Sequence, residues 1–248
     1  MQNKKLSSGN LHEFAFYYGG LSDILGEDID IKITCEDLYH RFKHVLRIKT
    51  DDRLILFNQK ERVIFIFAQF EGKNKILGTW QKRELNHTLT PEVTLILPLL
   101  KIDALSDAVY SCAEVGITNI QLVTTAKSQT PWNDKLSNKL DRVVVAAAEQ
   151  SKMYAYPTIL PPVALQDWLL KAPEGLKYHF DVTGVPFSQW YTPTSVDEKY
   201  FLLVGPEGDL TDEEKTLTKK SGFVSCLLTS TILRSVRAIS LITGIFRL

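Results

Sequence analysis

From residue 91 to its C-terminal end, the chain alternates short apolar runs with segments of helical periodicity. The strand-like runs lie at residues 93–97, 119–124, 176–182, 200–204 and 223–228, and the helical segments at 102–112, 134–151, 211–221 and 234–248. Strands separated by helices of this length predict a largely parallel sheet that is covered on both faces. We therefore expect an α/β domain over residues 91–248.

Residues 1–86 have a different pattern, in which turn clusters separate short β-rich runs. These runs are residues 13–18, 30–34, 53–58, 62–70 and 76–85. Short strands at this spacing predict a small β-barrel. Between the second and third runs, residues 37–49 indicate a short basic helix. The change of pattern places the domain boundary near residues 86–91.

Composition limits the possible partners of the chain. Its 248 residues include 29 Lys and Arg and 29 Asp and Glu, so no net charge draws the whole protein to nucleic acid or to a membrane. The apolar runs are far shorter than the roughly 18 residues of a membrane span, and the polar N-terminus lacks a secretory signal. The three widely spaced cysteines indicate reduced thiols. We expect a cytoplasmic protein without a membrane partner.

The most informative segment is residues 201–214, FLLVGPEGDLTDEE. An apolar strand ends at Val204, a Gly-Pro-Glu-Gly turn follows, and Thr211 with Glu214 forms the capping box that starts a helix. Ligands of open α/β sheets bind outside the carboxyl ends of strands. A second loop of this kind, residues 229–233, follows the run 223–228, and both loops flank one cleft if the two strands are neighbours. The alternative is that residues 205–208 form only a tight turn.

Motifs along nearly the whole chain then resemble one family. They are residues 40–47 (HRFKHVLR), 97–101 (LPLLK), 113–117 (AEVGI), 127–128 (KS), 147–151 (AAEQS), 205–208 (GPEG) and 232–234 (ILR). In this order they resemble the RsmE family of ribosomal RNA methyltransferases, which methylate N3 of a uridine in 16S rRNA.

The resemblance implies a complete architecture and activity. It implies a PUA-like RNA-binding β-barrel over residues 1–86 and a SPOUT-type methyltransferase domain with a trefoil knot over residues 91–248. It further implies that S-adenosylmethionine is the methyl donor, that 16S rRNA of the small ribosomal subunit is the substrate, and that the enzyme is a homodimer that uses no metal. His40 and His44 have the helical spacing of a metal pair, but no third ligand follows.

The two loops supply the expected cofactor-binding residues: Leu203, Gly205, Glu207, Gly208, Leu228, Thr229, Ile232 and Leu233. Methyl transfer needs an aligned nucleophile, and a uridine imide must lose its proton. Glu207 is therefore a candidate base, or a residue that holds the loop. Arg234 is the second candidate catalytic residue, as a partner of a phosphate or of a carbonyl that gains negative charge. A salt bridge from Arg234 to Glu207 is the alternative.

The expected RNA-binding residues lie in two basic patches: Arg41, Lys43 and Arg47 in the first domain, and Lys101 and Lys127 in the second. Clustered cations attract phosphates with salt-sensitive affinity. The alternative for the first patch is an ordinary solvated surface.

Several positions depart from the family pattern. Asp51, Asp209 and Thr229 replace glycines, Met153 replaces an arginine, Ser111 replaces a lysine, and Ser235-Val236-Arg237-Ala238 replaces Thr-Glu-Thr-Ala. These departures keep two other functions open. One is a non-catalytic ribosomal RNA-binding protein, and the other is an α/β enzyme that binds a phosphate at residues 205–208.

Overall fold

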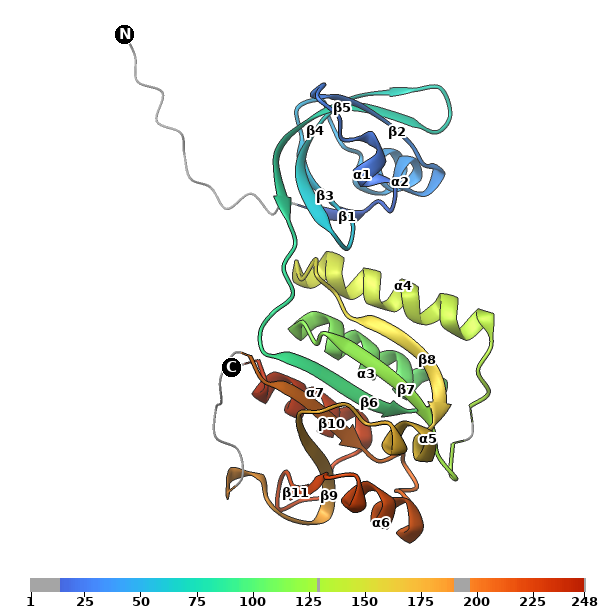
Figure 1. The fold of residues 1–248 in the computed structure, drawn as a ribbon. Coiled ribbons are helices and arrows are strands. Elements are labelled where there is room, and N and C mark those ends of the chain that lie inside the picture. Colours follow the sequence, from blue (N-terminus) through green and yellow to red (C-terminus); the bar gives the residue numbers. More distant parts are fainter. Residues whose placement is uncertain (1–13, 129, 190–196, 248) are drawn as a thin grey trace. The chain divides into compact units, whose positions relative to one another are not determined.

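The computed structural model describes residues 14–128, 130–189 and 197–247 (Figure 1). The chain divides into two units, residues 1–86 and residues 87–248. Within the described ranges, no helix is long and apolar enough to cross a membrane.

The N-terminal unit is built on a five-stranded sheet. Its strands are β1 (Phe14–Tyr17), β2 (Asp30–Thr34), β3 (Arg53–Phe57), β4 (Glu61–Glu71) and β5 (Lys75–Leu85). Their order is β1-β3-β4-β5-β2, with β1 parallel to β3 and the other pairs antiparallel. The edge strands β1 and β2 do not pair with each other, so the described sheet is open and the predicted closure into a barrel is not found.

Helical segments share the buried core of this sheet. They are α1 (Leu21–Ile24), α2 (Glu36–His40) and a π-helix, Arg41–Leu46. The single helix expected over residues 37–49 is found as α2 followed by the π-helix. Leu38 and Phe42 are buried in the same core as Leu56 and Phe65 of the sheet. Because these helices supply apolar cover, the short edge strands need not meet.

The turn before β3 explains one departure from the family pattern. Asp51 has a φ of 72°, in the left-handed region that favours glycine. Its amide donates to the carbonyl of Phe67, and the carboxylate of Asp52 accepts from the amide of Lys49 at 2.7 Å. Aspartate tolerates this backbone region better than most residues, so the turn forms without glycine.

The C-terminal unit is a three-layer α/β structure. Six parallel strands have the order β11-β9-β10-β6-β7-β8. In chain order the elements are β6 (Glu92–Pro98), α3 (Ile102–Val115), β7 (Asn119–Thr124), α4 (Asp134–Ser151), β8 (Thr158–Ala164), α5 (Leu165–Leu170), β9 (Leu176–Pro186), β10 (Lys199–Val204), α6 (Asp212–Lys220), β11 (Val224–Leu227) and α7 (Ser235–Ile245). The α/β prediction is confirmed.

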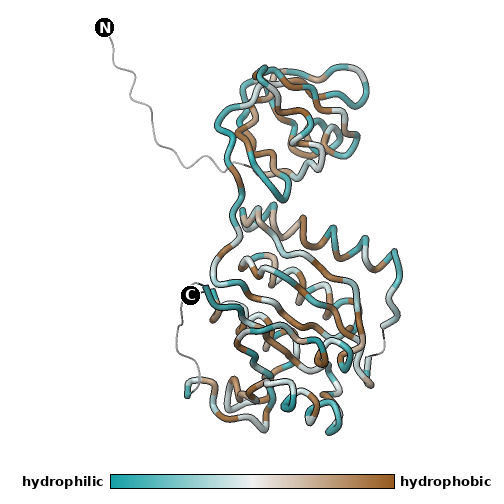
Figure 2. The backbone as a smooth tube through the Cα atoms, viewed as in Figure 1, coloured by the Kyte–Doolittle hydropathy of each residue, from teal (hydrophilic) through white to brown (hydrophobic). Residues whose placement is uncertain are grey.

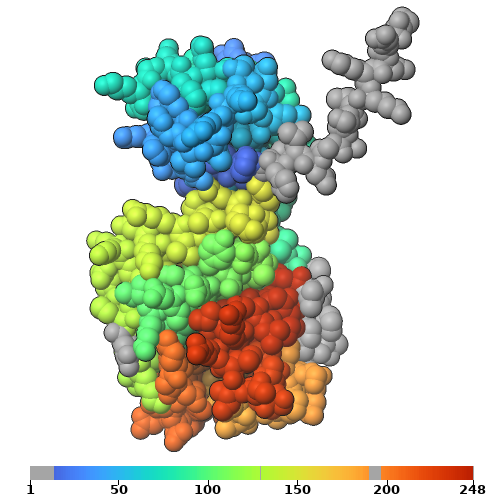
Figure 3. Space-filling view, turned by 180° about the vertical axis from the view of Figure 1, so that it is seen from behind, coloured from blue at the N-terminus to red at the C-terminus, as the bar shows by residue number. Residues whose placement is uncertain are grey.

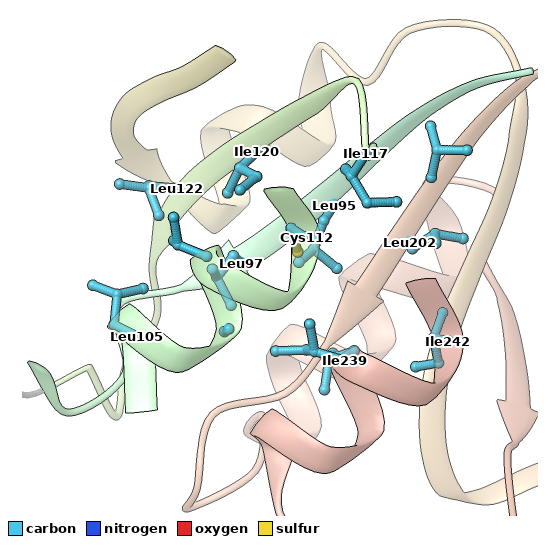
Figure 4. Packing of buried hydrophobic residues seen from close by; sticks show 14 of the residues in the cluster. Leu95, Leu97, Leu105, Cys112, Ile117, Ile120, Leu122, Leu202, Ile239 and Ile242 are labelled. Carbon is cyan, nitrogen blue, oxygen red and sulfur yellow. The ribbon is translucent and has the colours of Figure 1, made fainter. Parts of the chain in front are cut away.

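Alternating side chains of the central strands supply the two cores of this unit. On one face, Leu95 and Leu202 pack with side chains of α3, α4 and α7, as Figure 4 shows for Cys112, Ile239 and Ile242. The opposite face carries a smaller core with side chains from α5, as its cluster of buried residues shows. The buried strands accordingly appear as apolar stretches in the hydropathy colouring (Figure 2). Such double cover leaves the carboxyl edge of the parallel sheet as the place for a ligand.

Candidate functional site

The loops after β10 and β11 line one pocket. This pocket has a volume of about 220 Å³ and includes Gly205 and Glu207 from the first loop and Thr229 and Leu233 from the second. The two strands are not neighbours, because β9 lies between them and supplies Phe180, Asp181 and Val182 to the pocket. The sheet therefore brings the two loops together across a third strand.

A side chain of the last helix joins the two loops directly. The hydroxyl of Ser235, the first residue of α7, donates to the carbonyl of Gly205 at 2.9 Å. Ser235 stands where the family pattern has threonine, so the hydroxyl group is kept at this position. On the other side, the carboxylate of Glu207 accepts from the amide of Lys101 at 3.4 Å. These contacts tie the loop to both α3 and α7.

A larger cavity of about 810 Å³ adjoins this pocket, between α3 and α7. The two spaces share Glu207, Ile232, Leu233 and Ser235. The cavity is also lined by Lys101, Arg234 and Arg237, together with Asp107 and Tyr110. In the part of the chain that the structure describes, no ion pair joins Arg234 to Glu207. The expected alternative role for Arg234 is therefore not observed.

Two expected cofactor residues do not line the pocket. Leu203 is fully buried in the core beneath α5. The carbonyl of Gly208 accepts a hydrogen bond from the ammonium of Lys127 at 2.5 Å. Lys127 therefore braces the loop, and Lys101 lines the larger cavity; both lysines are exposed. The other expected cofactor residues, Gly205, Glu207, Leu228, Thr229, Ile232 and Leu233, all line the pocket.

The first basic patch lies in the N-terminal unit. The guanidinium of Arg41 lies 4.7 Å from the ring centre of Phe16, and the ammonium of Lys43 donates to the hydroxyl of Tyr39 at 2.7 Å. Arg47 ends the π-helix at a φ of 55°, and its side chain is exposed. Lys43 and Arg47 are both exposed, whereas Arg41 is partly buried and lies 3.8 Å from the carboxylate of Asp37.

Sequence reasoning missed an ion-pair triad on the pocket wall. The ammonium of Lys215 in α6 lies 2.7 Å from a carboxylate oxygen of Asp181 and 2.6 Å from one of Asp209. Burial raises the pKa of Asp181, but hydrogen bonds from Lys215 and Thr183 outweigh it and lower the value to about 2. The sequence offers one signal for this wall, because His179 and Asp181 are two residues apart in the strand-like run 176–182 and so point to the same face.

Asp209 has a φ of 60° directly after the Gly-Pro-Glu-Gly turn. Its second carboxylate oxygen accepts from the amide of Leu210 at 2.7 Å. The capping box predicted at the start of α6 is present, with Thr211 and Glu214 bonded reciprocally. Aspartate thus stands in for the family's glycine at this turn, and its two carboxylate oxygens are held by the amide of Leu210 and the ammonium of Lys215.

Two other departures leave the pocket geometry intact. Thr229 is not in the left-handed region, so its backbone does not require glycine, and its hydroxyl donates to the carbonyl of Thr231. Met153 follows α4 and packs near Gly116 at the amino edge of the sheet, opposite the pocket. Met153 does not line the pocket, so the replacement of the family's arginine at this position leaves the pocket lining unchanged.

With this geometry in place, comparison with known proteins identifies the class. Residues 88–247 match the RNA methyltransferase domain family, so the chain belongs to the RNA methyltransferases. Its relatives include proteins named ribosomal RNA small subunit methyltransferase E. The protein of this name from Rickettsia conorii is 29% identical over 217 residues, which cover 86% of this chain and 88% of that protein. The one from Mesomycoplasma hyopneumoniae is 26% identical over 199 residues, or 78% and 84% of the two chains. The family resemblance is confirmed.

Solved structures support the same fold. The ribosomal RNA small subunit methyltransferase E from Neisseria gonorrhoeae, bound to S-adenosyl methionine, superposes with a TM-score of 0.80 at 21% identity, covering 95% of this chain and 97% of that one. A putative methyltransferase from Legionella pneumophila, in complex with the same cofactor, gives 0.81 at 19% identity, with 96% and 98% coverage.

Proposed function

We propose that this protein methylates a base of small-subunit ribosomal RNA, with S-adenosylmethionine as the methyl donor. The observation that carries the proposal is the meeting of the two loops at one pocket beside a cavity lined by cations. Membership of the RNA methyltransferases supports it, as do relatives that are named ribosomal RNA small subunit methyltransferase E. The cofactor-bound proteins of the same fold favour the same donor.

The chemistry of the pocket fits this donor. Phe180, Val204 and Leu228 offer apolar walls for a flat base, while the carboxylates of Asp181 and Asp209 suit a cationic group. When bound, S-adenosylmethionine supplies a methyl group on a positively charged sulfur. Gly205, Thr229, Ile232 and Leu233 are proposed to hold it, with Leu203 supporting the floor and Gly208 the turn.

We further propose N3 of a uridine as the acceptor. Arg234 lines the larger cavity, where its guanidinium can hold a phosphate or a uracil carbonyl that gains negative charge as N3 loses its proton. Glu207 borders both spaces, so its carboxylate can accept that proton or keep the loop against Lys101. Both roles for Glu207 remain part of the proposal.

The N-terminal unit is proposed to be a PUA-like RNA-binding module whose sheet is open. Arg41, Lys43 and Arg47 would contact phosphates of 16S rRNA, and Lys101 and Lys127 would do so beside the pocket.

We also propose a homodimer in the cytoplasm. Its support is the surface where α3 and α7 lie side by side (Figure 3) and where Ile102 and Leu241 are exposed. The trefoil knot of SPOUT enzymes stays a prediction.

Ribosomal RNA from cells with and without the gene tests the activity. We expect one 16S base to lose its methyl group in the deletion strain, as measured by mass spectrometry of RNA fragments. Purified protein with S-adenosylmethionine should restore the group on small subunits from that strain. Unchanged 16S rRNA, together with no binding of S-adenosylmethionine at millimolar concentration, would instead support the non-catalytic RNA-binding alternative.

Replacing Arg47 by alanine is expected to weaken RNA binding about threefold at 0.1 M salt, because one phosphate contact is lost. It should also reduce the slope of log affinity against log salt by about one. Filter binding or fluorescence anisotropy over a salt series measures both quantities. Lys73→Ala, which alters an exposed lysine in the turn between β4 and β5, is the matched control and should change neither. Equal effects of the two variants would show that the patch is an ordinary solvated surface.

A further inference from the structure

The ion-pair triad of Asp181, Lys215 and Asp209 joins three separate elements at the pocket. Asp181 comes from β9, Lys215 from α6, and Asp209 from the loop after β10. Both carboxylate residues line the pocket, whereas Lys215 lies behind them and is not part of the lining. The ligand space is therefore lined by these two acids, together with Glu207 of the loop after β10, and not by the lysine that joins the two aspartates.

The triad carries one uncompensated negative charge. The side chain of Asp181 is 3% exposed and that of Lys215 is 21% exposed, so these two form the buried, neutralised part. The side chain of Asp209 is 49% exposed, which leaves the surplus charge at the pocket. Asp181 stays ionised at neutral pH because its pKa is about 2. The pocket wall is therefore negative under physiological conditions.

We propose that this triad is a charge-selective element, which makes the pocket bind the positively charged methyl donor more tightly than its neutral product. S-adenosylmethionine has a positive sulfur, whereas S-adenosylhomocysteine lacks the transferred methyl group and has a neutral thioether. Asp209 lines the pocket, so a sulfonium that binds beside it lies within a Debye length, roughly 10 Å at 0.1 M salt, of its carboxylate. This inference rests on the proposed function. Within it, the charge of Asp209 increases the preference for S-adenosylmethionine, and the charge of Lys215 decreases it.

The sign of the charge separates this role from mere support of the loop. Asp209→Asn removes the surplus negative charge, and asparagine retains the oxygen that accepts from Leu210 and tolerates a positive φ. Lys215→Met removes the positive charge, which leaves the carboxylates of Asp209 and Asp181 without their cationic partner, and Asp181 keeps only its hydrogen bonds from Thr183. A structural role predicts that both variants weaken both ligands, whereas charge selection predicts shifts in opposite directions.

Isothermal titration of the full-length protein with each ligand in turn is the test. For Asp209→Asn, we expect the preference for S-adenosylmethionine over S-adenosylhomocysteine to fall roughly three- to tenfold, and for Lys215→Met to rise by a similar factor. High salt should reduce the preference of the unaltered protein. Lys220→Met, an exposed lysine at the end of α6, is the control and should leave the preference unchanged.

The outcomes distinguish this inference from the function on which it rests. If the unaltered protein binds neither ligand, the proposed function fails. If it binds S-adenosylmethionine but Asp209→Asn leaves the preference unchanged, or both variants shift it in the same direction, only the charge selection is overturned. Because Asp209→Asn alters a partly exposed side chain, its effect on the preference decides between the two roles even where Lys215→Met does not fold.

Discussion

Alanine at Arg234 should lower the rate of 16S rRNA methylation about a hundredfold or more. Loss of one donor that stabilises developing negative charge typically has an effect of this size. Arg234 lines the larger cavity, and in the described part of the chain no ion pair joins its guanidinium to Glu207. Its backbone carbonyl accepts from the amide of Ala238, a contact that alanine retains, so α7 should still begin normally.

The Arg234→Ala rate is measured on small subunits that lack the methyl group, together with the affinity for S-adenosylmethionine. Because Arg234 lines the larger cavity and not the smaller pocket, that affinity should stay within about twofold. Arg142→Ala, an exposed arginine on α4, is the control. An unchanged rate would remove Arg234 from the catalytic site, and a parallel loss of cofactor affinity would show a displaced loop instead.

The elements with strong local signals were predictable from the sequence. The expected strand 119–124 and helix 134–151 coincide with β7 and α4, and Asn133 caps that helix through its side chain. β8 was missed because Pro161 and Pro162 interrupt its pattern, which is tolerated at a sheet edge. The six residues of α5 that follow are too few to establish a helical period.

Features that depend on long-range pairing were harder to predict. Five short strands are compatible with a barrel or with an open sheet, and the sequence does not show whether β1 meets β2. The candidate site likewise has parts that local sequence patterns predict and parts that depend on long-range packing. The loops at residues 205–208 and 229–233 were visible as local motifs, whereas the triad needs Asp181, Asp209 and Lys215 from three elements. Lys215 in particular has the sequence context of an ordinary exposed helix lysine.

His179 should make the C-terminal unit markedly less stable at mildly acidic pH. The residue is 1% exposed, and in the described structure its Nε2 atom has no hydrogen-bond partner. Burial lowers its pKa from 6.5 to about 4, although Asp181 and Asp209 oppose the shift. Lys215 and Lys219 of α6 add to the lowering. Between these two pH values, the unfolded chain binds a proton that the folded chain does not.

Stability is therefore fully present above pH 6.5 and falls as the pH drops towards 4, by an amount on the order of 3 kcal/mol. Asp181 does not contribute in this range, because its pKa lies near 2 in the folded state and at 3.8 in the unfolded chain, so its contribution is lost only at lower pH. Urea unfolding of the C-terminal unit at pH 7.5 and pH 4.5 measures the difference. His179→Leu should remove most of it, since leucine is apolar and does not titrate, whereas the exposed His87→Gln should retain it. A His179→Leu protein with the original pH dependence would show that other groups cause the acid sensitivity.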